Sequence, residues 1–185
     1  MKVYESRRDA AGLRVAIVVS RFNHLICARL LDGAVEELVA RGAERDALHV
    51  AWVPGAFEIP QAARTLAASG RYDAVVTLGV VIRGGTPHFD YVCRAVTDGV
   101  REVVRDCDVP VAFGVLTCDD VEQALARAGG EHGNKGAEAA LAAIEMAHLA
   151  RALRQPPGSG ERRRRGRGQP PRSGTRGPRS RGRRS

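Results

Sequence analysis

Apolar residues gather in four short runs rich in Val and Ile, a pattern typical of strands that are buried on both faces. The runs cover residues 14–20, 47–53, 74–82 and 111–116. The third run, AVVTLGVVI, is the most apolar segment of the chain, so we expect it to be the central strand of a sheet.

Apolar positions at helical spacing predict a helix after each of these runs. Leu30, Leu31, Ala34, Val35 and Leu38 illustrate the pattern, and Gly42 ends that first helix. The expected helices cover residues 23–41, 58–69, 89–106, 118–128 and 134–154, the fourth starting at a Thr117–Asp120 capping box. The alternation of strands and helices predicts an α/β fold: a three-layer sandwich with a four-stranded parallel sheet and helices on both faces.

The net charge of +8 is unevenly distributed between two predicted regions. Residues 155–185 hold eleven arginines and one acid, a balance of +10, which leaves −2 for residues 1–154. The C-terminal region contains no Leu, Ile, Val or aromatic residue, so we expect a folded domain over 1–154 and a disordered tail over 155–185. Nucleic-acid binding by this tail is one interpretation and a solvated extension is the other; the lack of aromatic residues for base stacking favours the extension.

The chain has no apolar stretch of membrane or export type. No run approaches the roughly 20 residues that a membrane helix needs, and the N-terminus MKVYESRRDAAG is not of signal-peptide type. We therefore expect a cytoplasmic protein without a membrane partner. The four cysteines form no CxxC pair, and Glu145 and His148 form only one E-x-x-H pair, so no metal site is predicted.

In a parallel sheet of this kind, ligands bind beyond the carboxyl ends of the strands. One of these ends carries the turn Arg83-Gly84-Gly85-Thr86-Pro87, whose glycines and following helix N-terminus suit a phosphate or carboxylate. His88 follows this turn and is either a proton-transfer residue or an ordinary surface or capping histidine.

Other candidate residues follow the first two strands. Phe22 and Phe57 would form an apolar wall for a planar ring, or would pack in the core. Glu58 would bind hydroxyl groups or cap a helix. Arg127 and Lys135 fall in the last two helices, where a charged solvent face is the ordinary expectation. These patterns alone name no substrate.

Four motifs, in order and at matching spacing, resemble the 6,7-dimethyl-8-ribityllumazine synthase family. They are SRFN at 20–23, PGAFEIP at 54–60, VIRGGTPHFD at 81–90 and GNKGAEAA at 133–140. The resemblance runs from about residue 3 to residue 154. It implies the flavodoxin-like fold of that family and the penultimate reaction of riboflavin biosynthesis. In that reaction, 5-amino-6-(D-ribitylamino)uracil condenses with 3,4-dihydroxy-2-butanone 4-phosphate, phosphate is released, and no cofactor or metal is needed.

The resemblance also assigns expected roles to individual residues. Phe22 would stack on the pyrimidine ring, and His88 would transfer protons. Gly85 and Thr86 would bind the phosphate together with Arg127. The remaining expected contacts are to the pyrimidine and its ribityl chain, and come from Ala56, Phe57, Glu58, Val80, Val81, Ile82, Phe113 and Lys135. Family members often have an acid where this chain has Gly85, and only a backbone contact is expected there.

Assembly is expected from the same resemblance. Phe113, Arg127 and Lys135 would enter the site of a neighbouring subunit in a homopentamer. Members that stop at pentamers carry extra residues between the last two helices. The short turn at residues 129–133 therefore predicts a hollow 60-subunit icosahedral capsid, with riboflavin synthase as a possible enclosed partner. A pure scaffold and an RNA-binding protein are the alternatives, and the presence of the whole candidate residue set favours the enzyme.

Overall fold

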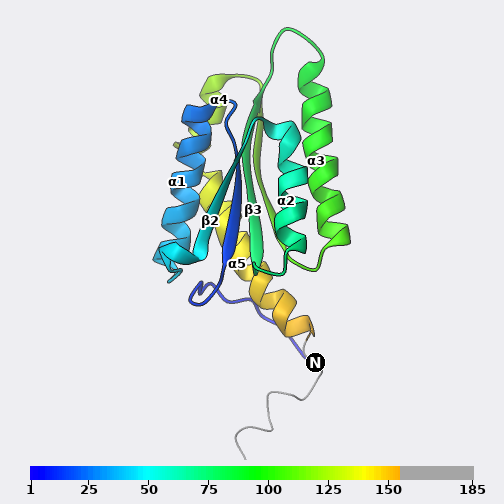
Figure 1. The fold of residues 1–185 in the computed structure, drawn as a ribbon. Helices are drawn as coiled ribbons and strands as arrows, with labels where there is room; N and C mark the ends of the chain where they lie inside the picture. Colours follow the sequence, from blue (N-terminus) through cyan, green and yellow to red (C-terminus); the bar gives the residue numbers. More distant parts are fainter. Residues whose placement is uncertain (155–185) are drawn as a thin grey trace, which may run out of the picture. The chain divides into compact units, whose positions relative to one another are not determined.

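The computed structural model describes residues 1–154, so the segment expected to be a disordered tail lies outside the described residues. Four strands form one parallel sheet in the order β2-β1-β3-β4 (Figure 1). The strands are β1 (Val15–Ser20), β2 (Leu48–Val53), β3 (Ala74–Ile82) and β4 (Val111–Cys118). The α/β prediction with a four-stranded parallel sheet is confirmed, and β3 lies inside the sheet between β1 and β4.

Helices cover both faces of the sheet. The helices are α1 (His24–Ala40), α2 (Ile59–Ala68), α3 (His88–Asp106), α4 (Val121–Ala126) and α5 (Lys135–Arg154), with short 3₁₀ turns η1 (Arg45–Ala47) and η2 (Ala56–Glu58). Helices α1 and α5 pack together on one face, whereas α2 and α3 lie side by side on the other (Figure 1).

Alternate residues of β1 supply the two apolar layers between sheet and helices. Val15, Ile17 and Val19 belong to the core under α1 and α5, whereas Ala16 and Val18 belong to the core under α2 and α3. All five side chains are fully buried. A strand of this kind has no solvent face, which explains its continuous apolar sequence.

Three details differ from the sequence-based prediction between the end of β4 and the start of α5. The strand continues to Cys118, and the cap of α4 is Asp120, whose carboxylate accepts a hydrogen bond from the backbone N–H of Gln123 at 2.7 Å. Thr117 therefore belongs to the strand rather than to a capping box. The connection from α4 to α5 is not a plain turn but a small antiparallel hairpin, β5 (Ala128–Gly130) with β6 (Gly133–Asn134).

Asn134 joins the start of α5 to α1. Its side-chain oxygen accepts hydrogen bonds from the backbone of Gly136 and Ala137, and its amide nitrogen donates to the carbonyl of Arg29 at 2.8 Å. Gly136 lies directly against the α1 backbone, because a Cβ at this position would be 2.0 Å from the carbonyl oxygen of Leu30. Gly136 and Asn134 thus give the Gly-Asn-Lys-Gly motif a structural role that does not depend on any ligand.

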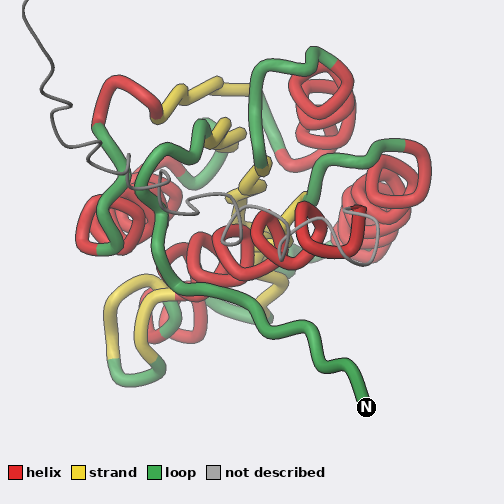
Figure 2. Tube along the Cα trace, turned by 90° about the horizontal axis from the view of Figure 1, so that it is seen from below, coloured by secondary structure: helices red, strands yellow, loops and turns green. Residues whose placement is uncertain are grey.

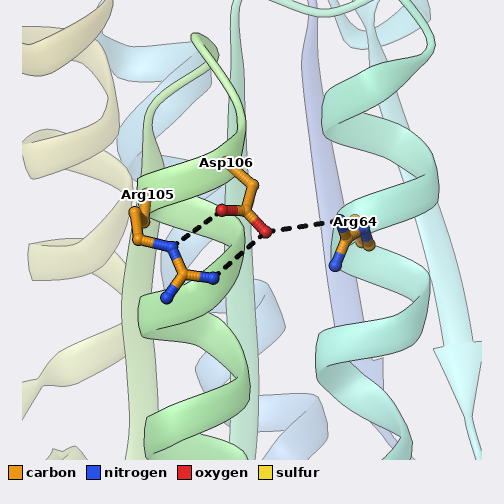
Figure 3. A network of polar contacts seen from close by, with 3 residues as sticks. All are labelled: Arg64, Arg105 and Asp106. Atoms are coloured by element: carbon orange, nitrogen blue, oxygen red, sulfur yellow. Dashed lines mark hydrogen bonds and ion pairs between the residues drawn. The ribbon is translucent and has the colours of Figure 1, made fainter.

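Polar contacts join other elements at the far ends of the helices. Asp106 accepts hydrogen bonds from Arg105 on its own helix and from Arg64 on α2 (Figure 3). The N-terminal segment runs beside α5, where Arg8 bonds to Glu145 and His148 to the carbonyl of Asp9 (Figure 2). Among residues 1–154, no helix has the length and apolarity that crossing a membrane requires.

Candidate active site

A cavity of about 690 Å³ opens at the carboxyl ends of β1, β2 and β3, where the sequence predicted a ligand site. Its lining comes from the turn after β1, from η2, from the end of β3 and from the start of α3. The lining residues are Phe22, Pro54, Gly55, Ala56, Phe57, Glu58, Val80, Val81, Ile82, Gly84, Thr86, His88, Phe89 and Val92.

The two phenylalanines at this cavity are surface residues. The exposed fraction is 70% for Phe22 and 63% for Phe57, so neither packs in the core. The backbone of the turn that carries Phe22 is fixed by its neighbours. Asn23 adopts a left-handed backbone conformation with φ of 58°, and its side chain donates a hydrogen bond to the carbonyl of Val80 at 3.1 Å. The buried thiol of Cys27 donates to the carbonyl of Phe22. These contacts fix the backbone and leave the aromatic ring free to meet a ligand.

Glu58 performs one of the two tasks that its position suggested. Its carboxylate accepts a hydrogen bond from the backbone N–H of Gly55 at 2.9 Å, which closes the η2 turn at the cavity wall. Because a carboxylate has about four acceptor sites, the group retains capacity for hydroxyl groups of a ligand.

The turn between β3 and α3 borders the cavity and is open to solvent. His88 is exposed as the first residue of α3. Gly84 and Thr86 line the cavity, whereas Gly85 does not. The N-terminus of a 19-residue helix points its free backbone N–H groups into this region, which suits an anion.

No lysine or arginine lines this cavity within the described chain. Glu58 and His88 are its only titratable lining residues there. A dianionic phosphate ester held in this cavity would therefore lack a cationic side chain from the same copy of the protein.

Three of the predicted site residues lie elsewhere. Phe113, Arg127 and Lys135 line a second cavity of about 460 Å³, over β4 and the start of α5. Phe113 is 44% exposed on the edge strand, and Arg127 donates to the carbonyl of Gln123. Lys135 bonds to Glu138 at 2.7 Å. One copy of the chain therefore carries the two predicted groups of site residues in separate cavities.

The sequence-based prediction missed several lining residues. Phe89 and Val92 line the cavity from the start of α3. The position of Val92, four residues after His88 and three after Phe89, was the available signal, because residues three or four apart lie on one face of a helix. Pro54, Gly55 and Gly84 lay inside the quoted motifs, but were not assigned a contact.

Together these features define an α/β protein with a small-molecule site at the carboxyl edge of a parallel sheet. Within residues 1–154, no group of three or more His, Cys, Asp or Glu side chains is arranged to hold a metal ion.

Comparison with known proteins identifies the family. Residues 12–151 match the family described as 6,7-dimethyl-8-ribityllumazine synthase. Proteins of that name from two strains of Clostridium kluyveri are 55% identical to this chain over 153 residues, covering 83% of this chain and 99% of the relative. The chain belongs to the 6,7-dimethyl-8-ribityllumazine synthase family, as its motifs predicted. It is a transferase of riboflavin biosynthesis that condenses 5-amino-6-(D-ribitylamino)uracil with 3,4-dihydroxy-2-butanone 4-phosphate and releases phosphate.

Proposed function

We propose that the reaction takes place at a composite site, formed by the larger cavity of one subunit and the β4–α5 surface of its neighbour. The observation that carries this proposal is the separation of charge within one chain. Among residues 1–154, no lysine or arginine lines the cavity with Phe22, Glu58 and His88, whereas Arg127 and Lys135 lie in the other cavity. Two copies brought face to face would supply both sets of groups.

Each substrate has a suitable surface in this arrangement. The pyrimidine would stack on the exposed ring of Phe22, with backbone groups of Val80, Val81 and Ile82 at its edge. The ribityl chain would lie along Ala56, Phe57 and Glu58, and reach Phe113 and Lys135 of the neighbour. The free acceptor sites of the Glu58 carboxylate suit its hydroxyl groups.

The phosphate would lie at the turn before α3, beside Gly85 and Thr86. The N–H groups of the helix N-terminus supply one set of donors, and the guanidinium of the neighbour's Arg127 supplies a charged, two-point contact. His88, between this turn and the pyrimidine surface, would move protons during imine formation, phosphate elimination and ring closure. These steps need proton transfer and positioning rather than a strong nucleophile.

The test is a kinetic comparison of the wild type with Arg127→Ala. Purified protein is incubated with both substrates, and lumazine absorbance and phosphate release are followed together. We expect equal amounts of the two products from the wild type. In the variant, the KM for the phosphorylated substrate should rise much more than the KM for the pyrimidine. Equal increases in both KM values would contradict the assignment of Arg127 to the phosphate.

We also propose that the subunits form a homopentamer and that twelve pentamers form a 60-subunit capsid. The residues between α4 and α5 support this, because β5 and β6 are joined by a tight hairpin, and a short turn here accompanies capsid formation in the family that the chain resembles. Electron microscopy and light scattering at moderate salt test the proposal, and particles no larger than a pentamer would contradict the capsid. Enclosure of riboflavin synthase would be seen as co-purification with the capsid.

The region beyond residue 154 and the cellular location complete the proposal. We infer a domain over 1–154 followed by a separate tail, which adds about +10 per subunit and should make the capsid sensitive to salt. Nucleic acid carried in purified particles would indicate that the tail binds it. A cytoplasmic location is in keeping with the four free cysteines.

A further inference from the structure

Arg83 is the first residue of the phosphate turn, and its side chain contacts three residues from two other parts of the molecule. Its Nε donates to Asp119 at 2.8 Å, in the turn between β4 and α4. Its guanidinium also bonds to Asp90 at 3.4 Å, in the first turn of α3. The same group lies over the ring of Phe89, with its central carbon 4.1 Å from the ring centroid. Arg83 therefore joins the start of the turn to the helix that begins with His88.

The rest of the turn has little to hold it in place. A Cβ built on Gly84 or Gly85 would meet no atom within 4 Å. Outside regular helices and strands, none of the hydrogen bonds within residues 1–154 involves a group of Gly84, Gly85 or Thr86. Two adjacent glycines also leave the backbone more freedom than any other pair of residues would. The position of the turn thus depends on the contacts at its two ends.

Both ends are held through Arg83. At the first end, its backbone N–H donates to the carbonyl of Cys118 at 2.9 Å, beside the contact with Asp119. At the second end, Phe89 and Asp90 directly follow His88. Each ion pair alone is exposed and weak, but a planar guanidinium that meets two carboxylates and an aromatic face restricts their relative orientation.

Arg83 is poorly placed to bind the phosphate itself. Its side chain is not among the residues that line the cavity, and two carboxylates already offset its charge. A direct phosphate contact would have to displace at least one of these carboxylates.

We propose that Arg83 is a positioning residue, which holds the Gly84–Gly85 turn and His88 in register through its contacts with Asp119, Asp90 and Phe89. This inference rests on the role proposed above for His88. It assigns to Arg83 an effect on turnover rather than on substrate affinity, because misplacing a positioned group by about 1 Å can cost ~100-fold in rate.

Four variants test the proposal: Arg83→Gln, Arg83→Lys, Asp119→Ala and the double variant Arg83→Gln/Asp119→Ala. We expect kcat to fall roughly 10–100-fold in both Arg83 variants, since an ammonium cannot reproduce the planar fork. Asp119→Ala should lower kcat in the same direction, and the double variant should be no worse than the worse single one. The KM for the pyrimidine should stay nearly constant.

A readout that is independent of catalysis accompanies the kinetics. Amide hydrogen exchange in peptides covering residues 83–91 should become faster in these variants, while peptides from α1 and α5 stay unchanged. Arg101→Gln is the matched control, because Arg101 forms a similar exposed pair with Asp98 farther along α3. It should change neither kcat nor exchange in the turn.

Each alternative has a distinct signature. If Arg83 bound the phosphate directly, Arg83→Gln would raise the KM for the phosphorylated substrate with kcat unchanged, and Asp119→Ala would not impair the enzyme. That result, additive losses in the double variant, or full activity in Arg83→Lys would overturn the positioning role. If His88→Ala proved fully active, the role of His88 would fail, and the exchange measurements would still decide whether Arg83 holds the turn.

Discussion

His88 is the residue on which the proposed chemistry depends most directly. Replacing it by Ala should lower kcat by roughly 10–10⁴-fold, the scale of general acid–base catalysis. Part of the activity should remain, because the cavity and the neighbour's cations still position the substrates. The matched control is His132→Ala, an exposed histidine in the β5–β6 hairpin that should have wild-type kcat. Steady-state kinetics on both variants make the comparison, and an unchanged kcat in His88→Ala would remove this residue from the mechanism.

Cys27 shows how burial changes the chemistry of a single side chain. Burial among apolar residues raises the pKa of its thiol to about 11, although a hydrogen bond with the backbone of Val80 acts in the opposite direction. Only about 0.1% of the thiol is then ionised at pH 8, and the thiolate is the reactive form. Iodoacetamide at pH 8 should therefore leave Cys27 unmodified in the native protein and modify it after unfolding. Mass spectrometry measures the alkylation of each cysteine. Alkylation of Cys27 at the same rate as the half-buried Cys107 would contradict the prediction.

At the scale of elements, the contact between α1 and α5 has no room for a side chain at Gly136. Gly136→Ala places a Cβ against the carbonyl of Leu30 and should destabilise the protein by roughly 1–3 kcal/mol, as is typical of overpacking. Thermal unfolding at one fixed protein concentration measures the loss. Gly84→Ala is the control for stability, because its Cβ would lie in open space. Equal unfolding temperatures for the two variants would mean that α1 and α5 can separate at little cost.

The contacts of Asp106 between α2 and α3 should make stability depend on pH. The hydrogen bond from Arg105 is the main cause that lowers the pKa of this carboxyl below its ordinary value of 3.8, and the charges of Arg105 and Arg64 add to it (Figure 3). Since the folded state has the lower pKa, the stabilisation is present above about pH 4 and is lost as the pH falls through the lowered value.

Asp106→Asn should therefore lower the unfolding temperature at pH 7, and the difference from the wild type should disappear toward pH 2. Asp98→Asn, which removes a single pair with Arg101 on the exposed side of α3, provides the control and should have a smaller effect. A difference for Asp106→Asn that stays constant from pH 7 to pH 2 would show that the carboxylate charge is not its cause.

Long periodic elements could be predicted from the sequence, whereas short ones could not. The strand over 74–82 has the same bounds in the structure, because seven of its nine residues are Ala, Val, Leu or Ile and leave no other placement. The β5–β6 hairpin was missed, since its five residues in two strands carry no alternation of apolar and polar positions. Asp120 rather than Thr117 caps α4, because the sequence shows which residues can cap but not where β4 ends.

The same limit applies to the candidate site. The residues of the larger cavity follow consecutive strands, so the parallel-sheet rule places them together. Arg127 and Lys135 carry no such signal, since the proposed site draws them from a neighbouring copy of the chain. Only the resemblance suggested that they belong to this site, and their position in a second cavity shows why local patterns did not.

For the whole molecule, the proposed division of the site between two surfaces would make activity a property of pairs of chains. His88→Ala damages one surface and Arg127→Ala damages the other, so rings built from either variant alone should have little activity at substrate concentrations near the wild-type KM values. In a ring that contains both variants, an intact His88 surface can face an intact Arg127 surface. Random mixing in equal amounts would restore about a quarter of the sites, because a head-to-tail interface pairs each surface with the opposite surface of the next subunit.

This reasoning predicts complementation between two defective copies of one gene. Co-expression of the two variants should recover about a quarter of the wild-type rate per subunit at these substrate concentrations, whereas mixing the separately assembled proteins without dissociation should recover none. The control is a single variant that carries both changes, co-expressed with the wild type. It checks the expected fraction of intact sites, because about a quarter of the sites should again be intact. Recovery close to zero after co-expression would place both residues in one subunit's own site. A cell carrying two differently damaged alleles would thus make riboflavin faster than a cell with either allele alone.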